Sequence, residues 1–360
     1  MMPLLNIKQS WAQIRAVIRL EMRKTFFAKR GLWVYALALG PVALYLVHSI
    51  DMLRDRDRRQ ALAAAHPAST ETLHSITRGM TRDEVVAALG EPYTPPEVFH
   101  RRSHERAVYR YTDGEADYSF TFFDDELVGI GRRERCNLTQ DSLIFATVFQ
   151  FYFLRLAIFF GCVGIFMNLF RGEMVDKSLH FYLLAPMRRE VLLLGKYLAG
   201  LIATVVIFTT STALQLWTMS LHFDARVIDD YLRGPGWSHV AGYMGVTALA
   251  CLGYGSVFLA AGLLFRNPII PAAIALVWES ANLFLPAALK KISVIFYLQS
   301  LCPVVAPPGK DMPPPLALLI SAAEPTPAVV AVTGLLVVTL VVLLMASMQA
   351  RKLEINYGAE

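Results

Sequence analysis

The residues of this chain with the clearest capacity for chemistry are charged side chains in apolar surroundings. Arg155 lies near the middle of the apolar segment 142–170, and Glu279 lies near the middle of another, 268–289. A charge inside a membrane is costly and is usually functional. Because the two residues have opposite sign and similar depth, we predict that they pair. The pair would either lock two helices together or belong to a polar pathway, whose further lining would be Gln150 and Asn282.

Other constellations of reactive residues are weak. A phosphate-binding loop needs Gly-x-x-x-x-Gly-Lys-Ser/Thr, whereas "EVLLLGKYLAG" contains a lone Gly-Lys pair. His100 and His104 have the spacing of two metal ligands on a helix, but Pro95 and Pro96 precede them and favour an exposed loop. No Ser-His-Asp set or paired zinc motif is apparent. We therefore predict no catalytic residue, no metal and no cofactor on this chain, and that it is not an enzyme.

The elements that must position these residues are transmembrane helices. Apolar residues make up 55% of the chain and the mean hydropathy is +0.44, whereas soluble domains contain about 45–50% apolar residues. A bilayer span needs about 20 mostly apolar residues. We predict an all-α polytopic membrane protein with six transmembrane helices. These are 32–50, 142–170, 197–220, 239–265, 268–289 and 327–350.

Lys and Arg in the short connections predict the orientation. The segments on the side of the termini contain fifteen Lys or Arg, whereas the opposite connections 221–238 and 290–327 contain five. Both termini, 1–31 and 351–360, are therefore predicted to be cytoplasmic, in a multi-pass protein of the inner (cytoplasmic) membrane of a bacterium. The net charge of +5 then suits anionic lipid headgroups and gives no argument for nucleic acid.

The N-terminal segment 1–31 has the pattern of an amphipathic helix. Apolar residues recur at helical spacing beside a basic row, as in helices that lie in a membrane interface. The apolar residues are Ile7, Trp11, Ile14, Ile18 and Met22, and the basic row is Lys8, Arg15, Arg19 and Arg23. The alternative is a basic leader that only orients the first span.

The region 51–140 interrupts the spans with soluble sequence. Residues 51–70 form a charged, Ala-rich stalk, after which Thr81 and Glu84 make a capping box that opens a short helix. Three strand signals follow, namely "RAVYRYT", "EADYSFTFF" after an Asp113-Gly114 turn, and "ELVGIGRRE". We predict a small α+β extracytoplasmic domain with helices on a three-stranded antiparallel sheet.

The stretch "ITRGMTRDEVVAALGEP" and the aromatic strands after it resemble the SmpA/OmlA outer-membrane lipoprotein domain, over about residues 70–135. The resemblance implies a periplasmic setting and a protein-binding role. This copy has no lipid-anchor Cys and is tethered by the flanking spans instead. The alternative is a rigid spacer that binds no ligand.

A charged stretch at 170–201, "FRGEMVDKSLHFYLLAPMRREVLLLGKYLAGL", joins the second and third spans. An amphipathic helix of mixed charge suits a groove of a cytoplasmic ATPase, because apolar residues give contact area and charges fix the register. This loop and the six-span plan resemble type-2 ABC exporter permeases. The resemblance implies a coupling helix at 173–194; the alternative is a plain interfacial loop. The expected coupling residues are Glu173, Asp176, Pro186, Arg188, Arg189 and Lys196.

The same resemblance implies the permease subunit of an ATP-driven exporter. ATP and Mg²⁺ would bind a separate cytoplasmic ATP-binding subunit, and the permease would pair with itself or with a sister permease. Membrane lipids and a periplasmic protein would be further partners. The alternative function is a non-transporting scaffold that presents the 51–140 domain for envelope assembly. Six spans and a coupling-like helix favour transport, because a scaffold needs only one span.

The connection 290–327 is expected to cap the outer side of the spans at 141–350. Its apolar stretches "ISVIFYLQSL" and "PLALLISAA" are too short to cross and fit re-entrant or interfacial helices. Cys136 and Cys302 both fall on the outer side, where an oxidising compartment favours disulfides. They are a candidate disulfide if their Cα atoms come within about 7 Å. The alternative is two unpaired thiols.

Overall fold

The chain folds into two compact units in the computed structural model. One, the helical unit, comprises Met1–Leu44, Ser142–Thr218 and Ile228–Glu360; the other, the sheet unit, comprises Tyr45–Asp141 and Met219–Val227. The structure describes residues 7–27, 31–65, 69–101, 104–134, 136–175, 184, 187–265, 267, 269–282, 285–304 and 326–351.

Five helices in the described ranges are long and apolar enough to cross a membrane. They are Leu32–Ala65, Leu138–Met174, Arg189–Ser220, Ala225–Leu264 and Ala328–Arg351. Their number and composition support a multi-pass membrane protein. The predicted span at 268–289 is wrong, because its described helix, Ile269–Ala281, has 13 residues. Such a helix is about 20 Å long, too short for a hydrocarbon core of about 30 Å.

Helical segments make up most of the described chain. Those up to the second span are α1 (Ile7–Phe27), α2 (Leu32–Ala65), α3 (Thr70–Ser75), α4 (Arg82–Leu89), α5 (Leu138–Val148), the π-helix η2 (Phe149–Ile158) and α6 (Phe159–Val175). Those after it are α8 (Arg189–Ser220), α9 (Ala225–Tyr231), the π-helix η3 (Leu232–Gly236), α10 (Trp237–Leu264), α11 (Ile269–Ala281), α12 (Ala287–Lys290), α13 (Val294–Leu301) and α15 (Ala328–Arg351).

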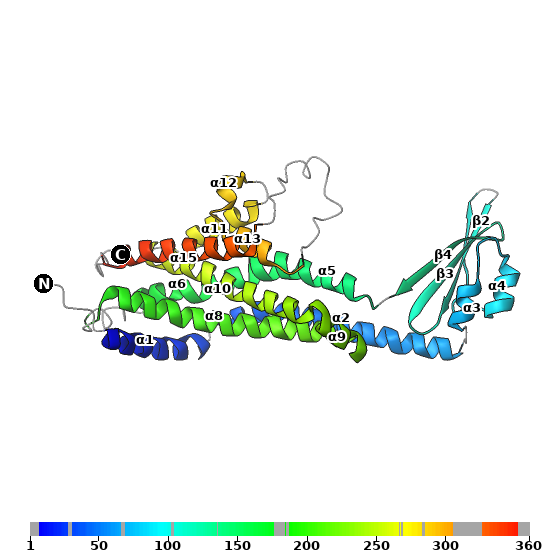
Figure 1. Cartoon of the computed structure of the whole chain (residues 1–360), viewed down its shortest axis with the longest axis horizontal. Coiled ribbons are helices and arrows are strands. Elements are labelled where there is room, and N and C mark those ends of the chain that lie inside the picture. Colours follow the sequence, from blue (N-terminus) through cyan, green and yellow to red (C-terminus); the bar gives the residue numbers. More distant parts are fainter. Residues whose placement is uncertain are drawn as a thin grey trace. The chain divides into compact units, whose positions relative to one another are not determined.

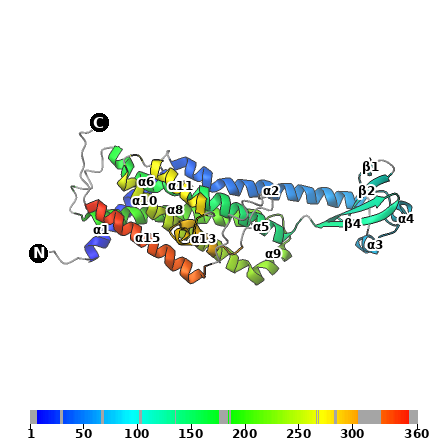
Figure 2. The same ribbon diagram turned by 90° about the horizontal axis from the view of Figure 1, so that it is seen from above.

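Helix α10 is the packing centre of the helical unit. It contacts α6, α13 and α15 (Figures 1 and 2). Its glycines permit a close approach, since a Cβ at Gly262 would lie 2.9 Å from backbone atoms of Met167 on α6. Gly255 is packed in the same way against the ring of Phe166. Interfaces built from small residues are typical of packing between membrane helices, because they let two backbones come close.

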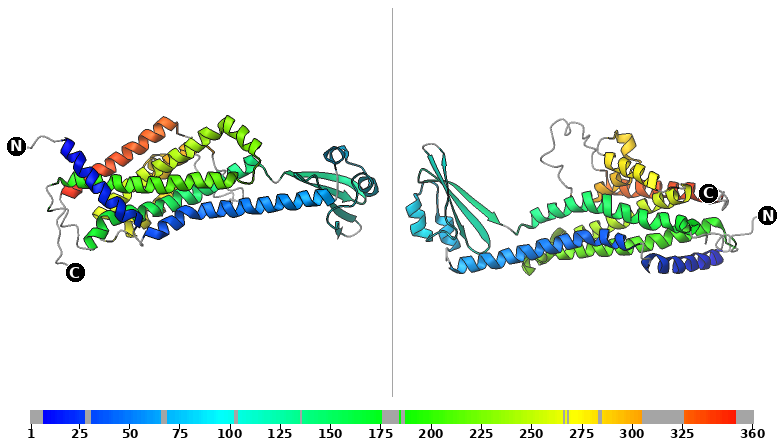
Figure 3. Two further views of the ribbon diagram at one scale, coloured as in Figure 1. Left: turned by 90° about the horizontal axis from the view of Figure 1, so that it is seen from below. Right: turned by 180° about the vertical axis from the view of Figure 1, so that it is seen from behind.

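The two described ends of the chain lie at one end of the helical unit. Helix α1 lies alongside the first turns of α8 (Figure 3), with Val17 about 3.0 Å from the Cβ position of Gly195. At the other terminus, the guanidinium Nε of Arg351 lies 2.6 Å from a carboxylate oxygen of Glu190, also on α8.

The sheet unit contains a four-stranded antiparallel sheet in the order β1-β2-β3-β4. Its strands are β1 (Glu97–Arg101), β2 (His104–Thr112), β3 (Ala116–Phe123) and β4 (Glu126–Glu134). The prediction of three strands is wrong because it missed β1, whose Glu97 aligns with Val108 of β2. Strand β1 shows no alternation of buried and exposed apolar residues, because both Val98 and Phe99 are exposed.

Helices α3 and α4 cover one face of the sheet (Figure 1). The core between them includes Leu73 and Val85 from the helices and Tyr118, Phe120 and Phe122 from β3. The three β3 residues alternate with less buried neighbours, as the sequence predicts. This core gives the sheet unit a hydrophobic centre of its own.

The capping box and the hairpin turn that the sequence predicts in the sheet unit are both present. The capping box of α4 is present, with the Thr81 N–H donating to the Glu84 carboxylate at 2.8 Å. In the β2–β3 turn the Asp113 carboxylate accepts the backbone N–H of Ala116 at 2.7 Å, and Gly114 has φ +93°. The predicted stalk is helical through Ala65, because α2 continues from the first span without a break.

Candidate functional site

A cluster of four charges occupies the end of the helical unit where α1, α6 and α8 meet. The ammonium of Lys196 lies 2.6 Å from a carboxylate oxygen of Glu21 and 2.8 Å from one of Glu173. The first contact is a hydrogen bond, whereas the second is an ion pair without hydrogen-bond geometry. Lys24 binds the other Glu173 oxygen at 3.1 Å. We call Glu21, Lys24, Glu173 and Lys196 the charge cluster.

Three members of the charge cluster are buried. The Lys196 side chain is fully buried, those of Glu21 and Glu173 are 4% and 8% exposed, and that of Lys24 is 52% exposed. The Lys196 ammonium also donates to the carbonyl of Leu169 at 2.8 Å. The two buried carboxylates share Lys196, and Lys24 reaches Glu173 from the surface; an unpaired buried charge would cost several kcal/mol.

Burial also affects the acidity of Glu21, which lies on α1 outside the long apolar helices. Its desolvation raises the pKa of this carboxyl above the ordinary value of a glutamic acid, and Glu173 acts in the same direction. Lys196 and Lys24 oppose the rise by stabilising the carboxylate. The protonation of Glu21 is therefore tied to the two lysines that hold α1 in place.

The structure gives the predicted coupling residues two different settings. Glu173 and Lys196 are buried and bind each other, so their side chains position helices and do not form an outer surface. Arg188 is exposed just before α8, and Arg189 donates from Nη1 to the carbonyl of Arg351 at 2.8 Å. Asp176, Pro186 and the middle of the predicted coupling helix, 176–183 and 185–186, lie outside the described residues.

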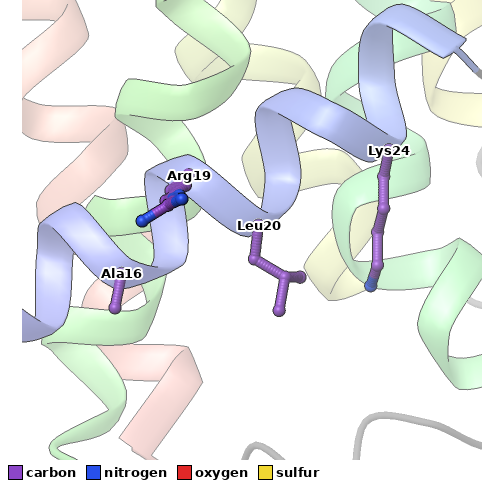
Figure 4. A pocket seen from close by; sticks show the side chains of 4 residues that line it. All are labelled: Ala16, Arg19, Leu20 and Lys24. Atoms are coloured by element: carbon purple, nitrogen blue, oxygen red, sulfur yellow. The ribbon is translucent and has the colours of Figure 1, made fainter.

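The outward side of α1 carries a second set of residues. Ala16, Leu20 and Lys24 point to the same side of the helix (Figure 4), and together with Arg19 they line a hollow. Leu20 is 45% exposed. Ile14, Val17 and Glu21 form the opposite, buried side. Of the predicted apolar face, Ile14 is buried and Trp11 is exposed.

Glu279 is buried in the helical unit, and its carboxylate has four donors. It accepts the backbone N–H groups of Val294 at 3.0 Å and Ile295 at 2.8 Å. The hydroxyl groups of Ser293 and Tyr254 donate to it at 2.8 Å and 3.3 Å. Since Val294 and Ile295 begin α13, Glu279 caps that helix from outside, and a helix N-terminus favours a negative charge.

Arg155 and Glu279, which the sequence predicts to pair, form no ion pair in the described part of the chain. They still interact electrostatically, while the hydrogen-bond donors of the Glu279 carboxylate include the backbone at the α13 N-terminus. Arg155 lies on η2 with its guanidinium carbon 5.3 Å from the centre of the Phe151 ring, a cation–π arrangement. Its Nε and Nη2 atoms have no hydrogen-bond partner. Arg155 is thus a partly exposed cation in the middle of the second span.

Gln150 and Asn282, the other two predicted pathway residues, donate hydrogen bonds to backbone carbonyls in the segment after α11. The amide of Gln150 donates to the carbonyl of Val304 at 2.8 Å. The amide of Asn282 donates to the carbonyl of Lys290 at 3.4 Å. Both side chains are buried. They therefore satisfy backbone carbonyls inside the helical unit, where water is not available to do so.

The candidate disulfide is absent from the structure. Cys136 and Cys302 are both free, Cys136 exposed and Cys302 buried. The Cys302 thiol donates to the carbonyl of Leu298 at 3.4 Å. Both cysteines lie in segments that the sequence predicts to be on the outer side.

A group of histidine, aspartate and serine side chains in the sheet unit has no counterpart in the sequence predictions. Asp141, in the first turn of α5, has a carboxylate oxygen 2.8 Å from Nε2 of His222 and 4.0 Å from Nε2 of His48. The hydroxyl of Ser49 lies 3.1 Å from Nδ1 of His222. The three acidic and imidazole residues are far apart in the sequence and form no local motif, so spacing could not reveal them.

His100 and His104, whose spacing the sequence analysis considered for a metal, lie on two different strands, β1 and β2. His104 begins β2, so helical spacing from His100 does not apply. Its Nδ1 lies 2.6 Å from a carboxylate oxygen of Asp124 on the surface of the sheet unit.

Comparison of the chain with protein-family models, with curated proteins and with solved structures found no match.

Proposed function

We propose that this chain is the membrane-spanning subunit of an ATP-driven exporter. It forms the translocation pathway as a dimer, with itself or with a sister permease, in the inner membrane of a bacterium. Its termini and the α6–α8 connection face the cytoplasm, where a separate ATP-binding subunit hydrolyses ATP.

The charge cluster carries this proposal. Lys196 joins α1 to the ends of two long apolar helices, at the side from which the charged α6–α8 connection leaves the unit. A force applied to α1 or to that connection would act directly on α6 and α8, because buried ion pairs resist separation. A membrane subunit driven by a soluble ATPase needs such a mechanical link between its contact surface and its spans.

The outward side of α1 and Arg188 supply the accessible part of the contact. Arg19 and Leu20 are exposed on α1, and Arg188 is exposed at the start of α8. A surface that combines apolar area with positive charge fits an acidic groove of a partner. Arg155, a cation in mid-span with unpartnered nitrogens, favours a substrate with an anionic group.

Co-purification from native membranes tests the proposal. We expect the tagged full chain, extracted in mild detergent, to retain an ATP-binding protein that mass spectrometry identifies by its phosphate loop. Arg188→Glu with Arg19→Glu should reduce its recovery at least tenfold. Arg226→Glu, an equally exposed arginine on α9, is the matched control and should leave recovery unchanged. Absence of any ATP-binding protein from the wild-type preparation would overturn the proposal.

A second candidate function is the non-transporting scaffold, and one feature of the sheet unit favours it. Phe99, Arg106 and Phe123 are aligned across β1, β2 and β3, so they share one face of the sheet. The two rings are 57% and 42% exposed, an arrangement typical of protein-binding surfaces. A photocrosslinker at position 99 that captures an envelope protein, together with no ATPase in the preparation above, would favour the scaffold.

A further inference from the structure

The side chains of His48, Asp141 and His222 converge in the sheet unit. They come from α2, from the first turn of α5 and from the turn after α8. One ligand atom of each lies within 4.8 Å of the other two. The His48 and His222 rings are nearly perpendicular, with centroids 5.5 Å apart. We propose that these three residues bind a divalent transition-metal ion of the zinc class.

The distances suit a small divalent ion. Ligand atoms about 2.0–2.2 Å from zinc stand roughly 3.3–3.5 Å apart in a tetrahedral site. The Asp141 carboxylate oxygen is 2.8 Å from Nε2 of His222 and 4.0 Å from Nε2 of His48. These two values lie on either side of the tetrahedral spacing, and all three ligand atoms lie within 4.8 Å of one another, so binding one ion would require side-chain movements but no change in the course of the backbone.

The donor set favours zinc over magnesium or calcium. Two imidazole nitrogens and one carboxylate oxygen are ligands of zinc and its neighbours in the transition series, whereas magnesium and calcium prefer oxygen alone. Three protein ligands leave one tetrahedral position for water. His48 has a side chain that is 27% exposed, which gives an ion a way in, while the other two ligands are at most 8% exposed.

Ser49 orients the ring of His222. Nε2 of His222 lies 2.8 Å from an Asp141 carboxylate oxygen, which can only accept, so a neutral His222 carries its proton on Nε2 and its Nδ1 accepts from the Ser49 hydroxyl at 3.1 Å. An ion bound at Nε2 would shift the proton to Nδ1, which would then donate to the Ser49 hydroxyl. Such an outer hydrogen bond is the usual companion of a metal-binding histidine. His48 supplies the second sign of a ligand, because its buried Nε2 has no hydrogen-bond partner.

The same residues do not favour hydrolysis by a Ser-His-Asp triad. Ser49 is fully buried within α2, so its hydroxyl is closed to a substrate. The triad would also leave His48 without a role. Ser49 is therefore a positioning residue, and Asp141, placed by the N-terminus of α5, is the anionic ligand.

Metal titration of the purified full chain tests the site. The chain is stripped with a chelator, loaded with Zn²⁺ or Co²⁺, desalted and analysed for metal. We expect one equivalent to remain, a rise in the melting temperature, and, with Co²⁺, the visible absorption of a four-coordinate complex. A wild-type chain that retains no ion after desalting and shows no shift in melting temperature would overturn the proposal.

Variants locate the ion. His48→Gln and His222→Gln should each abolish retention of one equivalent, and Ser49→Ala should weaken affinity about 10–100-fold. His104→Gln, which breaks the exposed pair with Asp124, is the matched control and should bind as the wild type does. Since His48 is partly exposed, its variant is the one least prone to misfold. Unchanged binding by His48→Gln would place the ion elsewhere and overturn the site.

Discussion

The ammonium of Lys196 lies 2.6 Å from the carboxylate of Glu21, although 175 positions separate the two residues. Their contact attaches α1 to α8 and involves a side chain with no exposed surface. Isolated ion pairs on a surface contribute little, but this one is buried together with Glu173. Breaking it would strand charges that have no access to water.

Replacing Lys196 by Met should destabilise the protein strongly. The change keeps most of the side-chain volume but leaves the Glu21 and Glu173 carboxylates buried together, at a cost of about 3–5 kcal/mol. Thermal unfolding of the detergent-purified chain measures the loss. Lys196→Met with Glu21→Gln should recover part of it, because one stranded charge is gone. Equal stability of the wild type and Lys196→Met would contradict a buried cluster.

Glu279→Ala should destabilise the helical unit by about 2–3 kcal/mol, since the first N–H groups of α13 lose a charged acceptor. Arg155→Ala should cost much less. In a double-mutant cycle the two changes should be nearly additive, with a coupling below about 0.5 kcal/mol. A coupling of several kcal/mol would restore the ion pair between Arg155 and Glu279.

Thiol labelling should distinguish Cys136 from Cys302. Cys136 is exposed and should react with a maleimide before any reduction. Cys302 should react only after denaturation, because it is buried and because burial raises the pKa of its thiol to about 12. Mass spectrometry of the labelled peptides reads both sites. If neither site reacts until a reductant is added, the free-thiol state is refuted.

The β2–β3 hairpin should lose stability in acid through Asp124. The backbone N–H of Glu105 and the ring of His104 hold the pKa of Asp124 below its usual value. The unfolded chain therefore binds this proton more tightly, so the stabilisation is complete above the unfolded pKa and is lost as pH falls through the folded pKa, below about pH 4.

Hydrogen exchange of the hairpin at pH 3 and pH 6 measures the Asp124 effect. After correction for the pH dependence of intrinsic exchange, Asp124→Asn should have lower protection factors than the wild type at pH 6 and should lose less protection on going to pH 3. Glu115→Gln, a change at an exposed carboxylate in the same hairpin, should preserve the wild-type pH response. An identical response in Asp124→Asn would rule out this carboxylate as the source.

Local patterns made much of the fold predictable. Five of the long apolar runs, the α4 capping box and the Asp113-Gly114 turn each depend on residues within a few positions of one another. The fifth predicted span failed because average hydropathy over 268–289 hides where its helix ends. Strand β1 was missed because its residues, EVFHR, do not alternate between apolar and polar.

The site was less predictable because its partners are set by tertiary packing. Arg155 and Glu279 were paired by sign and depth, but the N-terminus of α13 supplies positive potential without a charged residue. His48, Asp141 and His222 come from three distant segments. Only the convergence of α2, α5 and the turn after α8 brings them together.

The second long apolar helix contains the π-wound segment η2 between α5 and α6. A π-helix contains more residues per turn than an α-helix and occurs often at functional sites. Rewinding the ten residues of η2 as α-helix would turn α6 about its own axis and carry Glu173 away from Lys196. The ion pair between Glu173 and Lys196 would oppose this rotation of α6. Neutralising either residue would remove that opposition.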